Sequence, residues 1–598
     1  MKGDGKLLAL LLLLLSIVAI APMLEYGYPL NHSAPFNLSW AFQYQKQFFA
    51  GQFYPRWLEY SNFGFGNPTF AFYPPLCMVA TLPFRLLGLG LVGSLIGSMA
   101  LAIVFLGWGL YTYSRYFYPL QIAIIVAGVG ILSPYLMVDI YQRGAIAEVW
   151  GITTLPWILW ASQRLVDQSK SYQNILLLAL TYGLLILSHL PTLLIFTCIW
   201  LFFPWFLGNW QGIKRCYLGF ALACGWTAFY LLPVIGDRRF IQIDTFNTFK
   251  EYLPQHRLIL KITKDLGIGF SDHWFDKQII ASWLCMVAVV ILGIVVQFWK
   301  RNRNTKNVSV FWLLISLFSL LMTTSLLAWL YQLFVPLQKI QFSWRWLSLT
   351  TITIPLLLGY LFYQVRNIKL KEENFFYYIS PSSLLRVLVW SLVIISIIQG
   401  VKVAQKVDYQ PEVIAHFANL AVAKKFPYEP NQGSSNTLIN WHYVFCDGLA
   451  LVDVPEYRAK EATLPIPPPH NYLLLAWQDG TETNLNLQNW DYGIRKFEAN
   501  NLTSFPRQVV LRTFYYPGWQ TKIDGKKVLT QASSSGQLEI SIPPGKHQVQ
   551  IFYRGTLMYL LGRLIAVLTI VSCIIKSFNQ ETNNSYKVNR IHDQNSRN

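Results

Sequence analysis

Long apolar stretches alternate with short polar connections along most of the chain. Each stretch is about 20 residues long, which is the length of an α-helix that crosses the hydrocarbon core of a bilayer. The pattern therefore predicts an α-helical polytopic membrane protein with about twelve transmembrane helices. The predicted spans lie near residues 7–22, 90–112, 119–138, 149–166, 174–190, 191–207, 216–234, 278–298, 308–329, 346–365, 384–404 and 556–576.

The short connections on one side of the predicted spans are rich in lysine and arginine. Because positively charged loops stay in the cytoplasm, this asymmetry predicts cytoplasmic N- and C-termini for a protein of the plasma (inner) membrane. The basic residues of these inner connections are Arg115, Arg164, Lys170, Lys214, Arg215, Lys300, Arg301, Arg303, Lys306, Arg366, Lys369 and Lys371, followed in the tail by Lys576, Lys587 and Arg590.

The first apolar stretch resembles a signal peptide, since it follows Lys2 and Lys6 and contains the cleavage-like motif Ala19-Ile20-Ala21. Pro22 directly after this motif disfavours cleavage, so we expect an uncleaved first span. The expected organisation is a multi-span membrane domain at 1–404 with outer loops 23–89, 139–148, 235–277 and 330–345, an extracytoplasmic β-rich module at 405–555, a final span at 556–576 and a cytoplasmic tail at 577–598.

The C-terminal outer segment shows the alternation of apolar and polar residues that is typical of strands. Asp-Gly and Pro-Pro-Gly turn signals separate the alternating runs, so a β-meander or sandwich is expected. The predicted strands are Val509–Tyr516, Gln520–Ile523, Leu538–Ile542 and Gln548–Tyr553.

The first outer loop contains a helical pattern from Leu38 to Ala50. Its polar residues Ser39, Gln43, Lys46 and Gln47 share one face and aromatic residues cover the rest, which predicts a helix lying in the membrane interface. The stretch from Tyr54 to Pro75 that follows is rich in glycine, proline and aromatic residues and predicts an ordered, folded-back loop.

Composition agrees with a membrane protein, since only 13% of the residues are charged and the mean hydropathy is +0.35. The net charge of +19 raises the question of nucleic-acid binding. The basic residues lie in short turns between apolar runs rather than along one stripe, so we expect no nucleic-acid partner. The cysteines show no metal-ligand spacing, and Gly-rich phosphate loops and nucleotide-binding fingerprints are missing from the sequence.

Ionisable residues at the outer ends of spans are candidates for chemistry, because charges there are costly unless they are paired or used. In the loop 139–148, Asp139 and Arg143 are four residues apart and can form an ion pair if the loop is helical. Glu148 has no obvious local partner and is a candidate general base or metal-ligating carboxylate. Alternatively, all three residues anchor helix ends at the interface.

Five further residues each have a functional and a structural interpretation. His189, in the turn Ser188-His189-Leu190-Pro191-Thr192, is suited to binding a phosphate, shuttling a proton or capping a helix. Arg345, between two tryptophans, is suited to the phosphate of a lipid carrier or to aromatic-belt anchoring. Arg56 has the same alternatives. Glu25 and Glu59 in the first outer loop are candidate acids or bases, or solvated glutamates.

Four segments resemble bacterial membrane proteins labelled "6-pyruvoyl-tetrahydropterin synthase-related domain". They are GQFYPRWLEYSNFGFGNPTFAFYPPL, YQRGAIAEVWG, SHLPT and QFSWRWL. The C-terminal FYYPGWQTKIDGKKV and GQLEISIPPGKHQVQIFYRGT are similar to the outer module of related proteins that glycosylate cell-surface polymers. The resemblance implies a GT-C-like glycosyltransferase fold, and it implies no pterin chemistry.

In such enzymes a sugar leaves a polyprenyl-phosphate donor at the outer membrane face, and the first outer loop supplies an acidic catalytic residue. The corresponding stretch here, Asn31 to Asn37, contains no carboxylate. The resemblance therefore implies Glu25 or Glu148 as the catalytic carboxylate, with or without a divalent cation. For this reaction we expect the lipid phosphate to be bound by Arg56, Arg143, His189 and Arg345.

Two functions are expected on these grounds. The first is transfer of a sugar from polyprenyl-phosphate-sugar to an envelope glycan or lipid acceptor at the membrane. The second is a non-catalytic accessory or transport role in envelope polysaccharide assembly, which the missing first-loop carboxylate favours.

Overall fold

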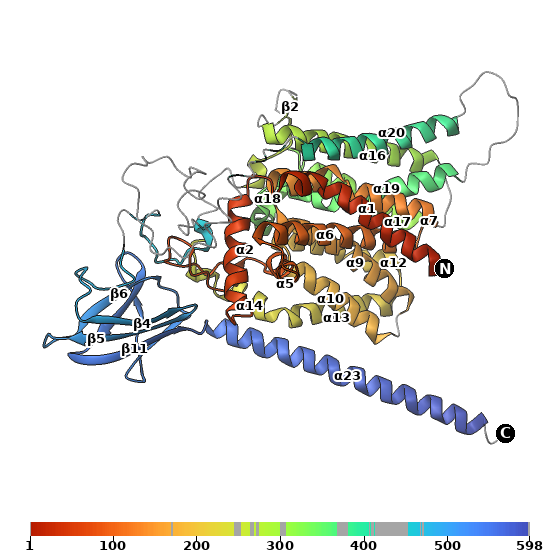
Figure 1. The fold of residues 1–598 in the computed structure, drawn as a ribbon. Helices are drawn as coiled ribbons and strands as arrows, with labels where there is room; N and C mark the ends of the chain where they lie inside the picture. The colour runs from red at the N-terminus through yellow and green to blue at the C-terminus, as the bar shows by residue number, and fades with distance from the viewer. Residues whose placement is uncertain are drawn as a thin grey trace, which may run out of the picture.

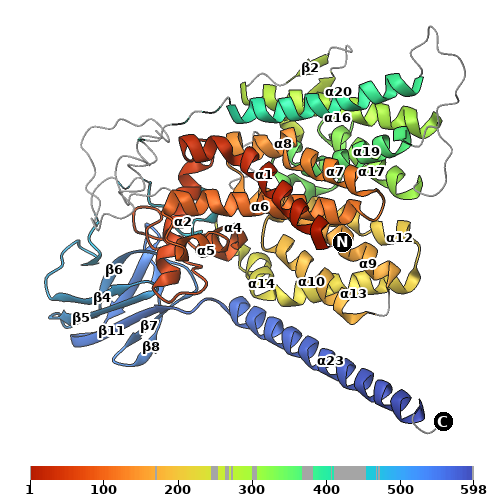
Figure 2. The same cartoon turned by 45° about the vertical axis from the view of Figure 1, so that its right-hand side comes forward.

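The computed structural model combines a bundle of helices with a β-rich module (Figure 1). Figure 2 shows the module at one end of the bundle, with the marked N- and C-termini away from it. The structure describes residues 2–168, 171–243, 253–262, 268–270, 274–299, 306–366, 381–405, 407, 409, 412, 453–466, 468 and 472–595.

The bundle contains the long helices that the apolar stretches predict. They are α1 (Lys2–Tyr26), α6 (Leu91–Ser114), α7 (Leu120–Ile131), α9 (Ile146–Asp167), α10 (Tyr172–Ile186), α11 (Leu190–Trp200), α13 (Trp210–Trp226), α14 (Ala228–Gly236), α16 (Trp274–Trp299), α17 (Lys306–Met322), α19 (Leu347–Arg366), α20 (Pro381–Gln405) and α23 (Leu557–Asn595). The shorter helices are α2 (Ala34–Phe49), α3 (Thr69–Phe72), α4 (Leu76–Val79), α5 (Leu82–Leu86), α8 (Pro134–Met137), α12 (Phe203–Leu207) and α18 (Trp329–Leu333). Single turns are η1 (Val138–Arg143), η2 (Arg238–Phe240), η4 (Pro254–His256), η5 (Val335–Ile340), η6 (Ser343–Trp346) and η7 (Pro455–Tyr457).

Seven helical segments in the described part of the chain are long and apolar enough to cross a membrane. The pair α13 and α14, bent by 74°, makes an eighth if it counts as one span. The prediction of a mostly helical chain with several candidate membrane spans is thus confirmed. The other four predicted spans coincide with α1, α9, α10 and α17, and their crossing of the membrane stays a prediction.

Helix α2 forms where an interface helix was predicted, but its polar face has a different environment. Ser39, Gln43 and Gln47 are 3%, 0% and 0% exposed, whereas a helix lying in the interface turns such residues to water. The Gln43 side chain binds the following loop instead: its Oε1 accepts from the backbone N–H of Tyr60 at 3.0 Å. The polar face of α2 therefore holds the first outer loop in place.

The C-terminal module is a sandwich of two antiparallel sheets. One has the strand order β3-β6-β10-β9 and the other β4-β5-β11-β7-β8. The four predicted strands are confirmed as β6 (Arg507–Phe514), β7 (Trp519–Ile523), β10 (Gln537–Ile542) and β11 (Gly545–Tyr553). The strands that were not predicted are β3 (Leu475–Trp477), β4 (Leu485–Asp491), β5 (Ile494–Asn501), β8 (Lys526–Val528) and β9 (Gln531–Ala532), and a separate pair joins β1 (Leu260–Ile262) to β2 (Ile268–Phe270). Most of 405–452 lies outside the described residues.

The first outer loop belongs to the core of the module. Trp57, Phe63 and Phe65 are buried in one apolar cluster with residues of both sheets. The backbone N–H of Phe514 in β6 donates to the carbonyl of Phe65 at 2.7 Å. Burial of these aromatic side chains stabilises the junction between loop and module. The loop is therefore ordered, as its glycine and proline pattern predicts, and it joins the membrane domain to the module.

A short segment of the module, residues 453–462, crosses the end of the bundle, and we call it the strap. Its Ala459 forms an antiparallel bridge with Ile241, just beyond α14 and η2. On the other side, the buried carboxylate of Asp453 accepts hydrogen bonds from Trp40 of α2 and from Ser61 and Thr69 of the first loop, at 2.9, 2.7 and 2.6 Å. The strap is thus fixed between the first loop and the chain that follows α14.

Candidate active site

The turn η1 places Asp139 and Arg143 on one side of a tight loop before α9. Gly144 follows with a φ of +64°, and a Cβ at this position would lie 2.0 Å from the side-chain oxygen of Asn31. Only glycine fits here, because other residues add both strain and a clash. The first loop fixes the turn further: Ser33 N donates to the carbonyl of Arg143 at 3.1 Å, and Asn37 Nδ2 to that of Gly144 at 2.7 Å.

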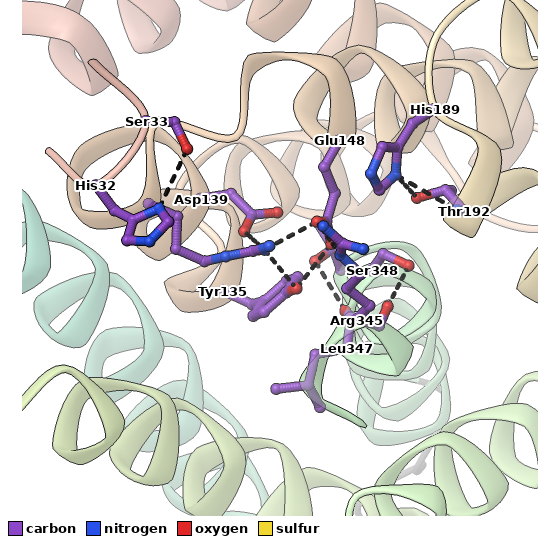
Figure 3. Close-up of polar contacts among 12 residues, drawn as sticks. His32, Ser33, Tyr135, Asp139, Glu148, His189, Thr192, Arg345, Leu347 and Ser348 are labelled. Carbon is purple, nitrogen blue, oxygen red and sulfur yellow. Dashed lines mark hydrogen bonds and ion pairs between the residues drawn. The ribbon is translucent and has the colours of Figure 1, made fainter. Parts of the chain in front are cut away.

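Arg143 connects the two carboxylates of this region. Its Nη1 atom pairs with Asp139, as the spacing of four residues predicts, and with Glu148 Oε2 at 2.9 Å. Nη1 also donates to the Tyr135 hydroxyl at 3.1 Å, and that hydroxyl donates to Glu148 Oε1 at 2.8 Å. Figure 3 shows Tyr135 and Asp139 directed toward Glu148.

Arg345 reaches the same glutamate from a distant part of the chain. It lies in η6 at the start of α19, and its Nε atom is 3.4 Å from Glu148 Oε2. Its Nη1 atom donates to the Ile340 carbonyl and to Gln341 Oε1, at 2.8 and 2.6 Å, which fixes the guanidinium plane. The prediction that Glu148 lacks a local partner is wrong, because Arg143, Tyr135 and Arg345 all contact it.

The four charged groups are buried together and balance each other. The side chains of Asp139 and Glu148 are 0% exposed, and those of Arg143 and Arg345 are 9% and 11% exposed. Such a buried network is costly unless its members pair. Within the described residues, Nη2 of Arg143 and Nη2 of Arg345 have no hydrogen-bond partner. Both guanidiniums therefore keep donors for an anionic ligand, the kind of contact that arginine makes with phosphate.

His189 lies beside this cluster and caps a helix, which is the structural role considered for it. Its Nδ1 atom accepts from the backbone N–H of Thr192 in the first turn of α11 at 3.4 Å and lies 2.8 Å from the Thr192 hydroxyl. Gly151 of α9, one turn beyond Glu148, leaves space for it, since a Cβ there would lie 3.1 Å from the His189 Cβ. In Figure 3 the imidazole lies next to Glu148 and Arg345.

His32 is a further residue near the cluster that was not predicted as a site residue. Burial lowers the pKa of His32, and the positive charge of Arg143 lowers it further. The imidazole is therefore neutral at neutral pH. The signal for it was the stretch from Asn31 to Asn37, where the resemblance implies acidic residues with a histidine and the chain keeps the histidine without a carboxylate.

The two remaining predicted site residues lie elsewhere. The guanidinium of Arg56 is held between the rings of Tyr54 and Tyr559, 4.3 and 4.5 Å from their centroids, and donates to the carbonyl of Phe229 at 3.2 Å. Glu25 is exposed near the end of α1. Of the six predicted site residues, the structure thus brings together Arg143, Glu148, His189 and Arg345.

The part of the chain that the structure describes contains no set of ligands for a metal ion. No group of three or more His, Cys, Asp or Glu side chains lies close enough together there. Asp139 and Glu148 approach each other, but Arg143 lies between them.

Comparisons with known proteins give structural neighbours only. No protein-family model and no curated protein matches the chain. Two solved structures of the arabinofuranosyltransferase AftD from Mycobacteria are similar at 14% and 11% identity, each with a TM-score of 0.39; they cover 68% and 93% of this chain and 27% and 60% of theirs. ArnT from Cupriavidus metallidurans bound to undecaprenyl phosphate is similar at 12% identity and a TM-score of 0.30, over 76% of this chain and 86% of its own. The chain thus spans less than two thirds of AftD, and TM-scores below 0.5 do not establish a shared fold.

Proposed function

We propose that the protein is a membrane glycosyltransferase that moves a sugar from a polyprenyl-phosphate donor to an envelope glycan or lipid acceptor at the outer membrane face. The observation that carries this proposal is the buried cluster, in which Glu148 orients two arginines that retain free donors. The resemblance of the C-terminal module to the outer module of proteins that glycosylate cell-surface polymers supports the reaction class.

Arg143 and Arg345 bind the phosphate of the donor in this proposal. When the bond between the sugar carbon and the phosphate oxygen breaks, negative charge develops on the departing polyprenyl phosphate. Two guanidiniums in a buried, fixed geometry stabilise that charge more than water does. A lipid phosphate needs no nucleotide, in agreement with a sequence that lacks nucleotide-binding motifs.

Glu148 has two roles in the proposed reaction. It fixes both guanidiniums through Oε2, and its Oε1 atom accepts one hydrogen bond, from Tyr135. Oε1 therefore keeps a lone pair for the proton of the acceptor hydroxyl. In the same proposal His189, which caps α11 beside the glutamate, also contacts the phosphate.

The second candidate function is a non-catalytic accessory or transport role in polysaccharide assembly. One observation favours it: the stretch from Asn31 to Asn37, which leads into the first turn of α2, contains no carboxylate. A protein with this role binds the lipid phosphate without cleaving the sugar–phosphate bond.

Sugar transfer in membrane vesicles tests the proposal. Vesicles with matched protein levels receive radiolabelled polyprenyl-phosphate-sugars, and transfer to endogenous acceptors is measured for the wild type, Arg345→Gln, Glu148→Gln and Glu25→Gln. Loss of one donor to a developing anion costs about 10²- to 10³-fold in rate, so Arg345→Gln should fall by that factor. Glu25→Gln, a matched change at an exposed glutamate, should retain activity.

Each other outcome selects between the candidates. Equal transfer by the wild type, Arg345→Gln and Glu148→Gln would refute the proposed site. Binding of the lipid phosphate by a wild type that transfers none of the sugars would favour the accessory role. Loss of activity in Glu25→Gln with full activity in Glu148→Gln would move the catalytic carboxylate to the first outer loop.

A further inference from the structure

Two tyrosines from different parts of the chain meet near the cluster of arginines. Tyr73 follows α3 in the first outer loop, and Tyr457 lies in η7 within the strap. Their ring centroids are 6.4 Å apart, and Trp40 of α2 continues the aromatic wall at 4.6 Å from Tyr73. On its other side the Tyr457 ring stacks on Phe72 at 6.3 Å.

The hydroxyl groups of this wall are unused. Both tyrosines are only partly buried, and neither hydroxyl has a hydrogen-bond partner among the described residues. Tyrosine hydroxyls that are removed from bulk water usually have a partner. The rings are fixed while the hydroxyls stay free, which is the arrangement of a binding surface rather than of a packed core.

The strap holds Tyr457 in this position from both sides. Asp453, four residues earlier, accepts three hydrogen bonds from α2 and the first loop, as described above. On the other side, Gln242 N donates to the carbonyl of Arg458 at 2.9 Å, and Lys460 N donates to that of Phe240 at 3.0 Å. The Tyr457 ring is thus positioned by side-chain hydrogen bonds to Asp453 before it and by backbone hydrogen bonds after it.

The aromatic wall lies next to the proposed phosphate site. Leu76 N, three residues after Tyr73, donates to the carbonyl of Leu187 at 2.9 Å, and Leu187 leads directly into His189. Burial raises the pKa of Tyr457, and the positive charge of Arg345 opposes that rise. The same guanidinium acts on Tyr73 in the same sense.

We propose that Tyr73 and Tyr457 form the sugar subsite of the donor, with their hydroxyls bound to sugar hydroxyl groups and their rings against the sugar ring. This proposal rests on the proposed function, since it takes the donor phosphate to lie at Arg345. A ring with a polar tip suits a sugar, which has an apolar face and a rim of hydroxyls. The C-terminal module then supplies part of the active site through the strap.

Binding of two lipid probes to the full-length protein tests the subsite. Farnesyl phosphate carries the phosphate alone, and farnesyl phosphate bearing glucose, mannose or arabinofuranose carries a sugar as well. The wild type should bind one sugar-bearing probe more tightly than farnesyl phosphate. Tyr457→Phe removes one hydroxyl and keeps the ring, so that this probe should bind about 2- to 10-fold more weakly. The affinity of Tyr457→Phe for farnesyl phosphate should equal that of the wild type. Tyr73→Phe should show the same two results as Tyr457→Phe.

Two further variants separate this proposal from the proposed function. Arg345→Gln should weaken both probes by the same factor, because the phosphate is common to them. Tyr515→Phe alters another partly buried tyrosine of the module and should leave both affinities unchanged.

Three results would overturn the subsite. Equal affinity of wild type, Tyr73→Phe and Tyr457→Phe for the sugar-bearing probe refutes it while the phosphate site stands. A tyrosine variant that weakens both probes equally shows that the hydroxyl acts on the fold and not on the sugar. A wild type that binds neither probe refutes the subsite together with the proposed function.

Discussion

Glu148→Gln removes the charge that holds the two arginines of the cluster. In the wild type, Asp139 and Glu148 contribute −2 and Arg143 and Arg345 contribute +2, so the buried network is neutral. The variant leaves one carboxylate for two guanidiniums, a net charge of +1 with the same burial. Removing one partner of a buried ion pair typically costs about 3–5 kcal/mol of unfolding free energy. Because the amide oxygen can still accept from Tyr135, we expect a loss near the lower limit, about 3 kcal/mol.

The free energy of unfolding can be measured by titration with sodium dodecyl sulfate in mixed micelles, followed by tryptophan fluorescence. Asp479→Asn is the matched control, because its partner Arg507 is also an arginine but the two side chains are 55% and 27% exposed. Water screens such an exposed pair, so this variant should change the unfolding free energy little.

A double variant makes the electrostatic origin of the loss testable. Glu148→Gln with Arg345→Gln restores a neutral network, with Asp139 paired to Arg143. It should therefore be more stable than Glu148→Gln alone, whereas independent sites would add their losses. A Glu148→Gln variant as stable as Asp479→Asn, or a double variant with the sum of both losses, would refute this account of the cluster.

Three further predictions concern the first outer loop and the strap. Gly66→Ala should cost about 2–3 kcal/mol of unfolding free energy in the same titration, since φ is +78° and the added Cβ would lie 2.4 Å from Trp57 Nε1; wild-type stability would contradict this. Glu59→Gln should speed hydrogen exchange in the first loop and in β5, because it breaks a buried ion pair with Arg495; unchanged exchange would show that the apolar core alone joins them. Burial raises the pKa of Glu456 from 4.5 to about 7, so folding gains stability that is fully present below pH 4.5 and is lost as the pH rises through 7. The loss of unfolding free energy amounts to about 3 kcal/mol. Proteolysis of the strap should therefore be faster at pH 8 than at pH 5.5. Glu456→Gln should remove this difference in susceptibility between the two pH values.

The long helices were predictable because a chain segment that crosses lipid as a helix needs a long apolar stretch, which is visible in the sequence. The membrane crossing of the α13–α14 pair and of the short α10 and α17 was harder to predict. A bend or a short helix changes how the chain crosses the membrane without changing its composition. In the module, β6, β7, β10 and β11 alternate clearly. Strand β5 was missed because Arg495 occupies an inward position, where it pairs with a glutamate of the first loop.

The candidate site was predictable residue by residue but not as a set. The spacing of Asp139 and Arg143 implies their ion pair. The contact between Glu148 and Arg345 joins positions far apart in the chain, and a single sequence carries no signal for it. Arg56 and Arg345 both have aromatic neighbours in the sequence, so the sequence alone does not distinguish them. In the structure the Arg56 guanidinium is held between two tyrosine rings, away from the cluster. The role of the strap rests on Asp453, whose side-chain donors Trp40, Ser61 and Thr69 come from α2 and the first outer loop.

A density map of the full-length protein incubated with undecaprenyl phosphate, obtained by cryo-electron microscopy, would locate the lipid phosphate directly. We expect the phosphate within about 3 Å of Nη2 of Arg345 and of Arg143, and we expect the same density to be lost in Arg345→Gln. A phosphate bound at Arg56, or one that stays in place when Arg345 is replaced, would contradict the phosphate site proposed for this cluster.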